Sequence, residues 1–144
     1  MIDPRTVNVL YVDDDDICQM MMRRTFKLAK FANPITCAQD GIDALERLQG
    51  TNGRERFPRP FLILTDLNMA RMGGIELLQE LRHDDELKES IVFILSTSNA
   101  AEIKAKAYNL GVAGYIHKTN SPNALMETAA LLDTYCRVVE FPAA

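Results

Sequence analysis

The sequence contains few cysteines, and their arrangement excludes two classes of small protein. Cys18, Cys37 and Cys136 are odd in number, widely spaced and form no CxxC motif. This pattern argues against a disulfide framework and against a structural zinc site. Reduced thiols in a cytoplasm are the simpler interpretation.

The sequence also lacks a long apolar run and an excess of basic charge. No apolar stretch approaches the roughly 20 residues that span a bilayer, and segment 1–5 has no apolar core of a signal peptide. A net charge of -4 and a pI near 5.2 give no basic footprint for nucleic acid. We therefore expect a cytoplasmic protein with no nucleic-acid partner and no membrane partner.

The most informative feature that is present is a run of four aspartates, Asp13 to Asp16, directly after the apolar run Val9 to Val12. Two unit charges about 4 Å apart repel by roughly 4 kcal/mol at an effective dielectric constant of about 20. A second apolar run, Phe61 to Thr65, ends in Asp66. Several carboxylates at one place need a cation or a proton. Alone, however, the acidic run also fits the solvated start of a helix.

The chain alternates short apolar runs with longer helical patterns. The short runs predict five strands, at 7–12, 35–38, 61–65, 91–95 and 114–117. The longer patterns predict five helices, at 16–30, 41–49, 75–82, 101–110 and 122–137. The first helix carries four apolar residues close to one face, namely Ile17, Met20, Met21 and Leu28. Gly50 is expected to end the second helix, and Pro122 lies at the expected start of the last.

The expected strands are nearly continuous in apolar residues, which is typical of parallel strands buried on both faces. Five β-α units of this kind predict an α/β fold with a doubly wound sheet. Ligands of such sheets bind beyond the carboxyl ends of the strands. The acidic run, Asp66, Ser96 and Lys118 all fall just past strand ends, so we expect them to meet at one edge of the sheet.

Four motifs, each following an expected strand, carry a resemblance to a known family. They are VLYVDDDD, LILTDLNMARMGG, VFILST and GYIHK, with 30 residues from Asp66 to Ser96 and 52 from Asp66 to Lys118. In order and spacing they resemble the receiver domain of two-component response regulators, over residues 6 to about 137. The resemblance implies a flavodoxin-like fold with five parallel strands in the order 2-1-3-4-5 and helices on both faces. It also implies one receiver domain over 1–144, with a short tail at 138–144 and no output domain.

The resemblance implies a phosphorylation site that needs Mg²⁺ or Mn²⁺. Asp66 would be the phosphoacceptor, attacking a phosphohistidine on a sensor histidine kinase. Asp14 would bind the metal directly, Asp13 would help through water, and the backbone carbonyl of Asn68 would supply another oxygen. These ligand types suit Mg²⁺, which is held by one or two carboxylates together with waters and phosphate.

Further residues would bind the phosphoryl group and switch the domain. Lys118 would pair with the phosphoryl oxygens, or with Asp66 beforehand, and Ser96, followed by Thr97, would hydrogen-bond the group. Tyr115 would rotate inward behind Ser96, although it fits equally well as a core aromatic residue. Two residues would tune the lifetime of the phosphoryl group during slow self-dephosphorylation, namely Asn68 and Ser98. Asp15 and Asp16 are expected to cap the first helix.

Four positions depart from the family pattern, and one of them, Ser96 in place of the commoner threonine, keeps the hydroxyl. Thr119 follows Lys118 where most receivers have proline, so a cis bond is not assumed there, because a cis non-proline bond costs roughly 2.5 to 4 kcal/mol. Ala70 stands in place of a common proline and Gly73 in place of a common aspartate. Both changes are expected to loosen the loop that follows Asp66.

Two other functions compete with a phosphoacceptor that is not a turnover enzyme. Asp13-x-Asp15 after an apolar strand resembles the acid pair of haloacid-dehalogenase-type phosphatases, but the further adjacent acidic pair of that family is missing after Lys118. A pseudo-receiver that binds partners without phosphorylation is the third hypothesis. The complete acidic and basic set argues against it.

Two segments suggest a subtype. The arginine-rich connection Thr51 to Pro60 and the tail Val138 to Pro142 resemble single-domain receivers that partner bacterial phytochromes. The resemblance implies a sensor kinase, in this case of the phytochrome type, and a downstream protein or phosphotransfer partner. It also implies a homodimer, in which the apolar tail is buried across a two-fold interface.

Overall fold

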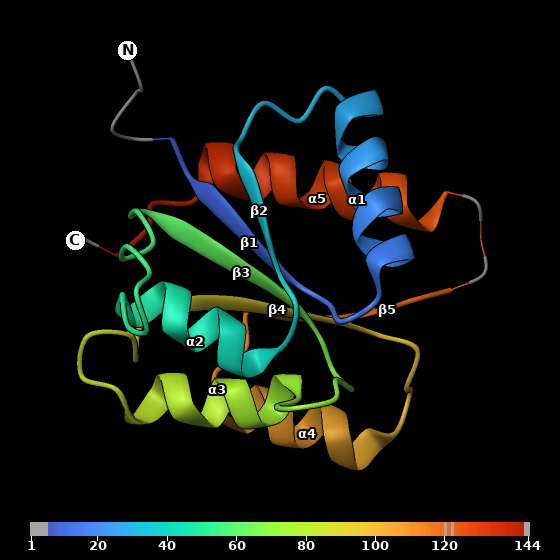
Figure 1. Ribbon diagram of the computed structural model, residues 1–144. Coiled ribbons are helices and arrows are strands. Elements are labelled where there is room, and N and C mark those ends of the chain that lie inside the picture. Colours follow the sequence, from blue (N-terminus) through green and yellow to red (C-terminus); the bar gives the residue numbers. More distant parts are fainter. Residues whose placement is uncertain (1–5, 120, 122, 143–144) are drawn as a thin grey trace.

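Five parallel strands form one twisted sheet in the computed structural model (Figure 1). The structure describes residues 6–119, 121 and 123–142. The spatial order is β2-β1-β3-β4-β5, as expected. The strands are β1 (Asn8–Val12), β2 (Ile35–Ala38), β3 (Phe61–Asp66), β4 (Ile91–Ser96) and β5 (Gly114–His117).

Five helices cover the two faces of the sheet. Helices α1 and α5 lie together on one face, and α2, α3 and α4 cover the other (Figure 1). Their bounds are α1 (Asp16–Leu28), α2 (Gly41–Gln49), α3 (Gly74–His83), α4 (Ala101–Asn109) and α5 (Ala124–Val138). This is the expected doubly wound α/β arrangement. Across the described residues, no helix is both long and apolar enough to cross a membrane.

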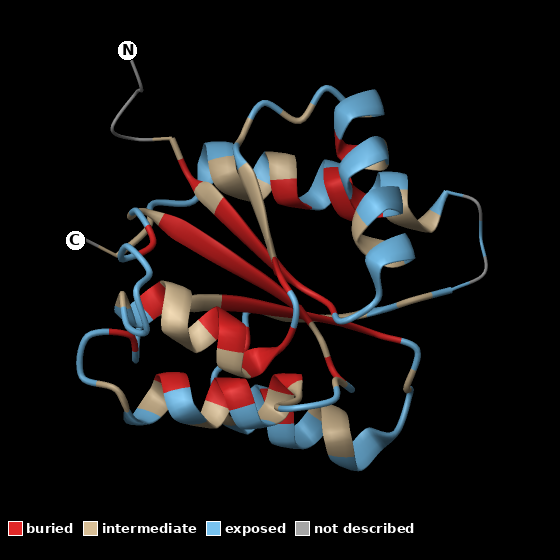
Figure 2. Cartoon of the chain, viewed as in Figure 1, coloured by how far each residue is buried: buried red, intermediate tan, exposed pale blue. Residues whose placement is uncertain are grey.

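The core has two layers, one on each side of the sheet. Along β1, Leu10 and Val12 face the layer under α2, α3 and α4, whereas Val9 and Tyr11 face the layer under α1 and α5. Strands β1, β3 and β4 are buried on both faces (Figure 2). Their apolar continuity in the sequence therefore has the expected cause.

The expected start of α1 and the expected end of α2 are confirmed, whereas α1 ends at Leu28, two residues before the expected end. The carboxylate of Asp15 accepts hydrogen bonds from the amides of Ile17 and Cys18, and Asp16 occupies the first turn of α1. Gly50 ends α2 with a φ of 71°, a left-handed conformation that a residue without Cβ adopts readily. Helix α5 begins at Ala124, and the expected start at Pro122 lies outside the described residues.

The packing face of α1 differs from the expected one. The buried residues are Met22 and Phe26, one turn apart. The apolar residues on the other side are 63%, 58%, 50% and 70% exposed, and we call them the α1 stripe: Ile17, Met20, Met21 and Leu28. Three consecutive methionines offer apolar side chains in several directions, so the periodicity alone does not decide which face packs on the sheet.

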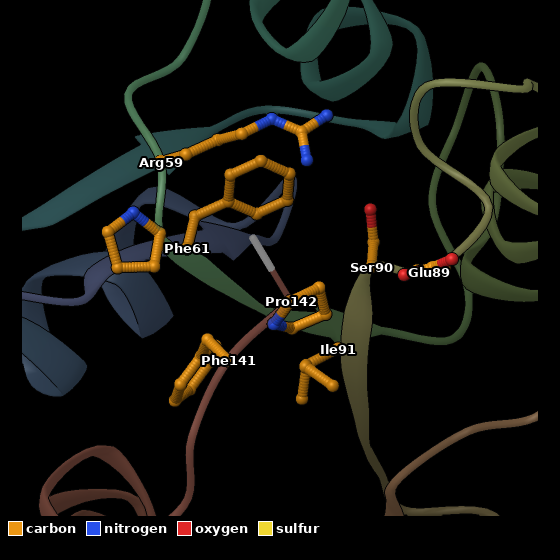
Figure 3. Close-up of a pocket in the computed structure, with 8 residues that line it drawn as sticks. Arg59, Phe61, Glu89, Ser90, Ile91, Phe141 and Pro142 are labelled. Atoms are coloured by element: carbon orange, nitrogen blue, oxygen red, sulfur yellow. The ribbon is translucent and has the colours of Figure 1, made fainter. Parts of the chain in front are cut away.

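The C-terminal tail folds back onto its own chain. The ring of Phe141 packs edge-on against Tyr135 at 5.8 Å, and Tyr135 packs in the same way against Phe93 at 5.1 Å. Figure 3 shows Phe141 and Pro142 beside Phe61 and other residues at the start of β3 and β4, around a small cavity of about 20 Å³. The tail therefore covers the edge of the sheet opposite the one where the acids gather.

The arginine-rich connection between α2 and β3 is held by ion pairs and one buried aromatic residue. The guanidinium of Arg54 lies 2.6 Å from the carboxylate of Asp43, and Arg56 pairs with Glu86. Phe57 is buried, and its amide donates to the carbonyl of Arg47 at 2.8 Å. The connection is long, but these contacts anchor it to α2 and to Glu86.

Candidate functional site

Three carboxylates meet at the carboxyl ends of β1 and β3. Val12 lies opposite Thr65 in the parallel ladder, so the next residues along both strands come together. One oxygen from each of Asp13, Asp14 and Asp66 can be chosen so that all three lie within 4.8 Å of one another. Asp13 is buried, Asp66 is half-buried and Asp14 is exposed, so the cluster is open on one side.

Lys118 supplies the positive charge of the site. Its amide donates to the carbonyl of Ser96 at 2.6 Å, which extends the pairing of β5 with β4 by one residue. Its Nζ lies 3.9 Å from Asp66 Oδ2 and 3.7 Å from Asp13 Oδ2. One ammonium thus faces two of the three carboxylates, and the local charge stays negative.

The electrostatic balance at Asp66 reflects this excess of negative charge. Burial raises the pKa of the Asp66 carboxyl, and the charges of Asp13 and Asp14 raise it further. Lys118 and the amide of Leu67 act in the opposite direction, but the pKa stays above its ordinary value. A cation at this place would therefore favour the ionised carboxylate.

Tyr11 is a residue of this site that the sequence reasoning missed. Its hydroxyl donates to Asp13 Oδ2 at 2.6 Å, and the amide of Asp15 donates to Asp13 Oδ1 at 3.0 Å. Burial raises the pKa of Tyr11, and Asp13 adds to the effect, so the hydroxyl stays protonated as a donor. The alternation of a strand puts positions 11 and 13 on the same face, and this signal was available in the sequence.

The loop from Leu67 to Gly73 is held tightly against the site. The amide of Leu67 donates to Asp66 Oδ1 at 2.8 Å, and the amide of Ala70 donates to Asp14 Oδ2 at 3.2 Å. Gly74 closes the loop by donating to the carbonyl of Leu67 at 2.8 Å. Backbone amides of the loop thus contact two of the carboxylates and close the loop, and the expected loosening stays a prediction.

The expected phosphoryl-binding and switch residues surround the carboxyl end of β4. Ser96 is buried, and its hydroxyl accepts a hydrogen bond from the amide of Ser98 at 3.0 Å. Tyr115 packs against the core, and its hydroxyl donates to the carbonyl of Ser98 at 2.9 Å. Thr97 is exposed, and its carbonyl lies 3.0 Å from Nε2 of His117. Tyr115 thus combines a core contact with a polar contact to the loop after β4.

The remaining expected positions also lie at this edge. Asn68 is exposed, two residues after Asp66, in the loop described above. The bond between Lys118 and Thr119 is not cis, and the cis bond that the structure does contain among its described residues is Arg59–Pro60. Lys118 reaches the carboxylates without a cis bond after it.

The donor set fits a hard divalent cation. Carboxylate and carbonyl oxygens are the ligands that Mg²⁺ and Mn²⁺ prefer, and no thiol or imidazole belongs to the three-residue cluster. A partly open group of acids beside one lysine can also place an anionic group between the cation and the ammonium. The arrangement therefore suits a reaction on a phosphoryl group.

Comparisons with known proteins agree with this interpretation. The family described as the response regulator receiver domain matches residues 9–130. The chain is 28% identical over 137 residues to the response regulator Rcp1 from Synechocystis, which covers 94% of this chain and 93% of Rcp1.

Solved structures show the same likeness. The structure of RPA3017, a response regulator in red light signalling of R. palustris, superposes with a TM-score of 0.84 at 25% identity, covering 96% of this chain and 99% of that one. The Mn²⁺-bound form of Rcp1 gives a TM-score of 0.81 at 26% identity, covering 95% and 99%. The likeness spans nearly the whole of all three chains.

Proposed function

Because this chain belongs to the response regulator receiver family of two-component signalling, we propose that Asp66 accepts a phosphoryl group from a sensor histidine kinase. The reaction depends on Mg²⁺ or Mn²⁺. The observation that carries the proposal is the cluster of Asp13, Asp14 and Asp66, with one oxygen of each within 4.8 Å of the others. The ammonium of Lys118 faces two of these carboxylates, Asp13 and Asp66. Receivers as a family accept phosphoryl groups from histidine kinases and pass the signal to partners.

The proposed step is an in-line displacement at phosphorus. A carboxylate oxygen of Asp66 attacks, the P–O bond forms as the P–N bond of the phosphohistidine breaks, and the imidazole nitrogen keeps the electron pair. A divalent cation held by Asp13, Asp14, Asp66 and the Asn68 carbonyl would neutralise the carboxylates and the phosphoryl oxygens. The protein contributes mainly position and charge, which is what phosphoryl transfer requires.

Residues around Asp66 respond to the negative charge of the phosphoryl group. Lys118 moves its ammonium from the carboxylates to the phosphoryl oxygens, since these now carry about -1.5 to -2 charges. Ser96 moves its hydroxyl to donate a hydrogen bond to a phosphoryl oxygen, which draws the hydroxyl oxygen away from the amide of Ser98 and shifts the loop after β4. Tyr115 reports the shift, because its hydroxyl is bonded to the carbonyl of Ser98. Thr97 lies between Ser96 and Ser98, so it belongs to the segment that shifts.

The lifetime of the phosphoryl group depends on what flanks the path of an attacking water. We assign this role to Asn68 and Ser98, which follow Asp66 and Ser96 at the same interval of two residues. Slow self-dephosphorylation is the chemistry proposed here, without turnover of a separate substrate. The acceptor would therefore be a signalling component and not a phosphatase.

The kinase is proposed to dock on the face of α1. The α1 stripe is exposed there, and a cleft of about 410 Å³ lies between α1, the end of β5 and α5. Met21 and Lys118 both line this cleft, so the docking surface reaches the phosphorylation site. A phytochrome-type kinase is the proposed partner, because RPA3017, a response regulator in red light signalling, has a similar structure and because of the resemblance in the connection at 51–60 and in the tail.

Output is proposed to pass to a downstream protein or a phosphotransfer protein in a cytoplasm. Homodimerisation through the tail is part of the same proposal. Val138 is 70% exposed and Val139 37% exposed, so both offer apolar surface to a second copy even though Phe141 is packed on its own chain. Light scattering that gives a monomer with and without a phosphoryl mimic would remove the dimer from the account.

The test of the main proposal is incubation with acetyl phosphate and Mg²⁺, followed by intact-mass measurement. We expect one added phosphoryl group that is stable in acid and labile in base, and no addition in Asp66→Asn. Asp133→Asn, which removes a carboxylate far along α5, is the matched control and should be phosphorylated normally. Equal phosphorylation of Asp66→Asn and wild type would overturn the assignment.

A further inference from the structure

Arg71 and Asp40 form a two-point ion pair between the loop after β3 and the start of α2. Arg71 Nε donates to Asp40 Oδ2 at 2.7 Å, and a terminal nitrogen donates to Asp40 Oδ1 at 3.2 Å. Asp40 is buried, whereas the side chain of Arg71 is 57% exposed. Such a fork fixes orientation as well as distance, which a single point charge does not.

The carboxylate of Asp40 is itself anchored to α2. It caps the helix by accepting a hydrogen bond from the amide of Asp43 at 2.8 Å. Burial acts to raise the pKa of Asp40, but the hydrogen bonds from Arg71 and Asp43 outweigh it and the pKa lies below its ordinary value. The carboxylate of Asp40, which accepts the hydrogen bonds of Arg71, is therefore held in place and stays charged.

A second contact joins the same two segments. The amide of Gly41 donates to the carbonyl of Met72 at 3.0 Å. A Cβ at Gly41 would lie 2.6 Å from Cγ of Met72, so only glycine allows this close approach. The start of α2 thus contacts two adjacent residues of the loop, Arg71 and Met72.

This loop carries the groups that face the proposed metal. The amide of Ala70, the residue before Arg71, donates to the carboxylate of Asp14 at 3.2 Å. Asn68, whose carbonyl is a proposed ligand, lies three residues before Arg71. A shift of Arg71 would be transmitted to both within one short, closed loop.

We propose that Arg71 and Asp40 are positioning residues that hold the loop from Leu67 to Gly73 in its metal-binding arrangement. The pair touches no reacting atom and acts through Ala70 and Asn68. The inference rests on the proposed function, since the loop has a metal to bind only if the site is a receiver site. It goes beyond that function, because it assigns a role to two residues outside the phosphorylation site.

The test measures metal binding apart from phosphorylation. The free Mn²⁺ signal in electron paramagnetic resonance is titrated with wild type, Arg71→Gln, Asp40→Asn and the double variant, all without a phosphodonor. Asn at position 40 keeps an oxygen for the amide of Asp43, so the helix cap remains. Arg54→Gln is the matched control, because it removes another arginine that pairs with a buried acid on α2, Asp43, away from the loop.

We expect each single variant to weaken Mn²⁺ binding by roughly threefold to tenfold. This loss is no larger than that expected from removing a residue that hydrogen-bonds a metal ligand directly, because Arg71 and Asp40 act through the loop. The double variant should be no weaker than the single ones, because the two residues act as a unit. Arg54→Gln should bind as wild type does. With acetyl phosphate, Arg71→Gln should need several-fold more Mg²⁺ for half-maximal phosphorylation and reach a near-normal rate at saturating Mg²⁺.

Four outcomes decide between the inference and the proposed function. Unchanged Mn²⁺ affinity in folded Arg71→Gln, or additive losses in the double variant, would overturn the positioning role. A loss in Arg54→Gln equal to that in Arg71→Gln would do the same, because the effect would then be general. Wild type that neither binds Mn²⁺ nor becomes phosphorylated would instead overturn the proposed function. The Mn²⁺ affinity of Arg71→Lys should lie between those of wild type and Arg71→Gln, since lysine keeps the charge but cannot form both hydrogen bonds to Asp40.

Discussion

In the metal-free protein, neutralising Asp66 is expected to stabilise the fold. Asn at position 66 keeps an oxygen that can accept the hydrogen bond from the amide of Leu67. Lys118 keeps Asp13 as its partner, at 3.7 Å. The substitution thus removes one negative charge and leaves the other contacts of the site in place.

The distances in the site give the magnitude. Two carboxylates within 4.8 Å each repel Asp66 by about 3.5 kcal/mol at an effective dielectric constant of about 20, whereas Lys118 at 3.9 Å attracts it by about 4 kcal/mol. At that separation the net repulsion is about 3 kcal/mol, and water screens the share of the exposed Asp14. We therefore expect Asp66→Asn to raise the free energy of unfolding by about 1 to 3 kcal/mol near pH 7.5 in the absence of metal.

The pH dependence has a definite sign. Because the pKa of Asp66 is raised in the folded state, the folded chain binds more protons than the unfolded chain while this carboxyl titrates. The unfavourable contribution is absent below the ordinary value near 3.8, and it grows as the pH rises through the folded-state pKa. The difference in the free energy of unfolding between Asp66→Asn and wild type should therefore increase with pH and then level off.

Urea unfolding followed by circular dichroism, between pH 4 and pH 8, checks this. In EDTA, Asp66→Asn should be more stable than wild type. Excess Mg²⁺ should narrow or reverse this difference in the free energy of unfolding, since a bound cation stabilises wild type. The control Asp133→Asn, an exposed i,i+4 partner of Arg137, should change stability by less than about 1 kcal/mol. A variant no more stable than wild type in EDTA would refute the electrostatic reasoning.

Three further predictions concern single contacts, and urea unfolding tests all of them. Lys118→Met should lower the metal-free stability by roughly 1 to 3 kcal/mol, because it leaves the buried carboxylate of Asp13 without its cation; unchanged stability would contradict this. Tyr11→Phe removes only the hydroxyl that donates to Asp13 and should cost roughly 1.5 to 3 kcal/mol, and a change below about 0.5 kcal/mol would show that the hydrogen bond contributes little. Phe141→Ala should cost roughly 1 to 3 kcal/mol through the lost burial and the lost contact with Tyr135, whereas a tail that contributes nothing would leave the midpoint unchanged.

The parallel sheet could be predicted because its strands are nearly continuous apolar runs followed by polar residues. The strand order was predicted from the family resemblance, since apolar patterning does not determine it. Parallel strands expose their carboxyl ends at one edge, so residues as distant as Asp13 and Lys118 were expected together, and they lie 3.7 Å apart. Strands β3 and β4 extend one residue further than expected and include Asp66 and Ser96. Asp66 lies opposite Leu95 and Ser96 lies opposite His117, so both polar residues belong to the ladder, which the periodicity of apolar residues cannot show.

The packing face of α1 and the closure of the loop from Leu67 to Gly73 could not be predicted from the pattern. Met20, Met21 and Met22 are chemically alike, and only the shape of the sheet surface selects Met22. The tight loop depends on hydrogen bonds between distant backbone groups, such as that from Gly41 to Met72. The substitution pattern at Ala70 carries no information about these tertiary contacts.

The central claim is that Asp66 is the residue that carries the phosphoryl group. Protein treated with acetyl phosphate and Mg²⁺ can be reduced with borohydride, which converts an aspartyl phosphate into homoserine, and the modified peptide can then be identified by mass. We expect homoserine at position 66, no modification at Asp13 or Asp14, and no modification at any position in EDTA. Homoserine at Asp13 with an unmodified Asp66, or none under any condition, would contradict the account.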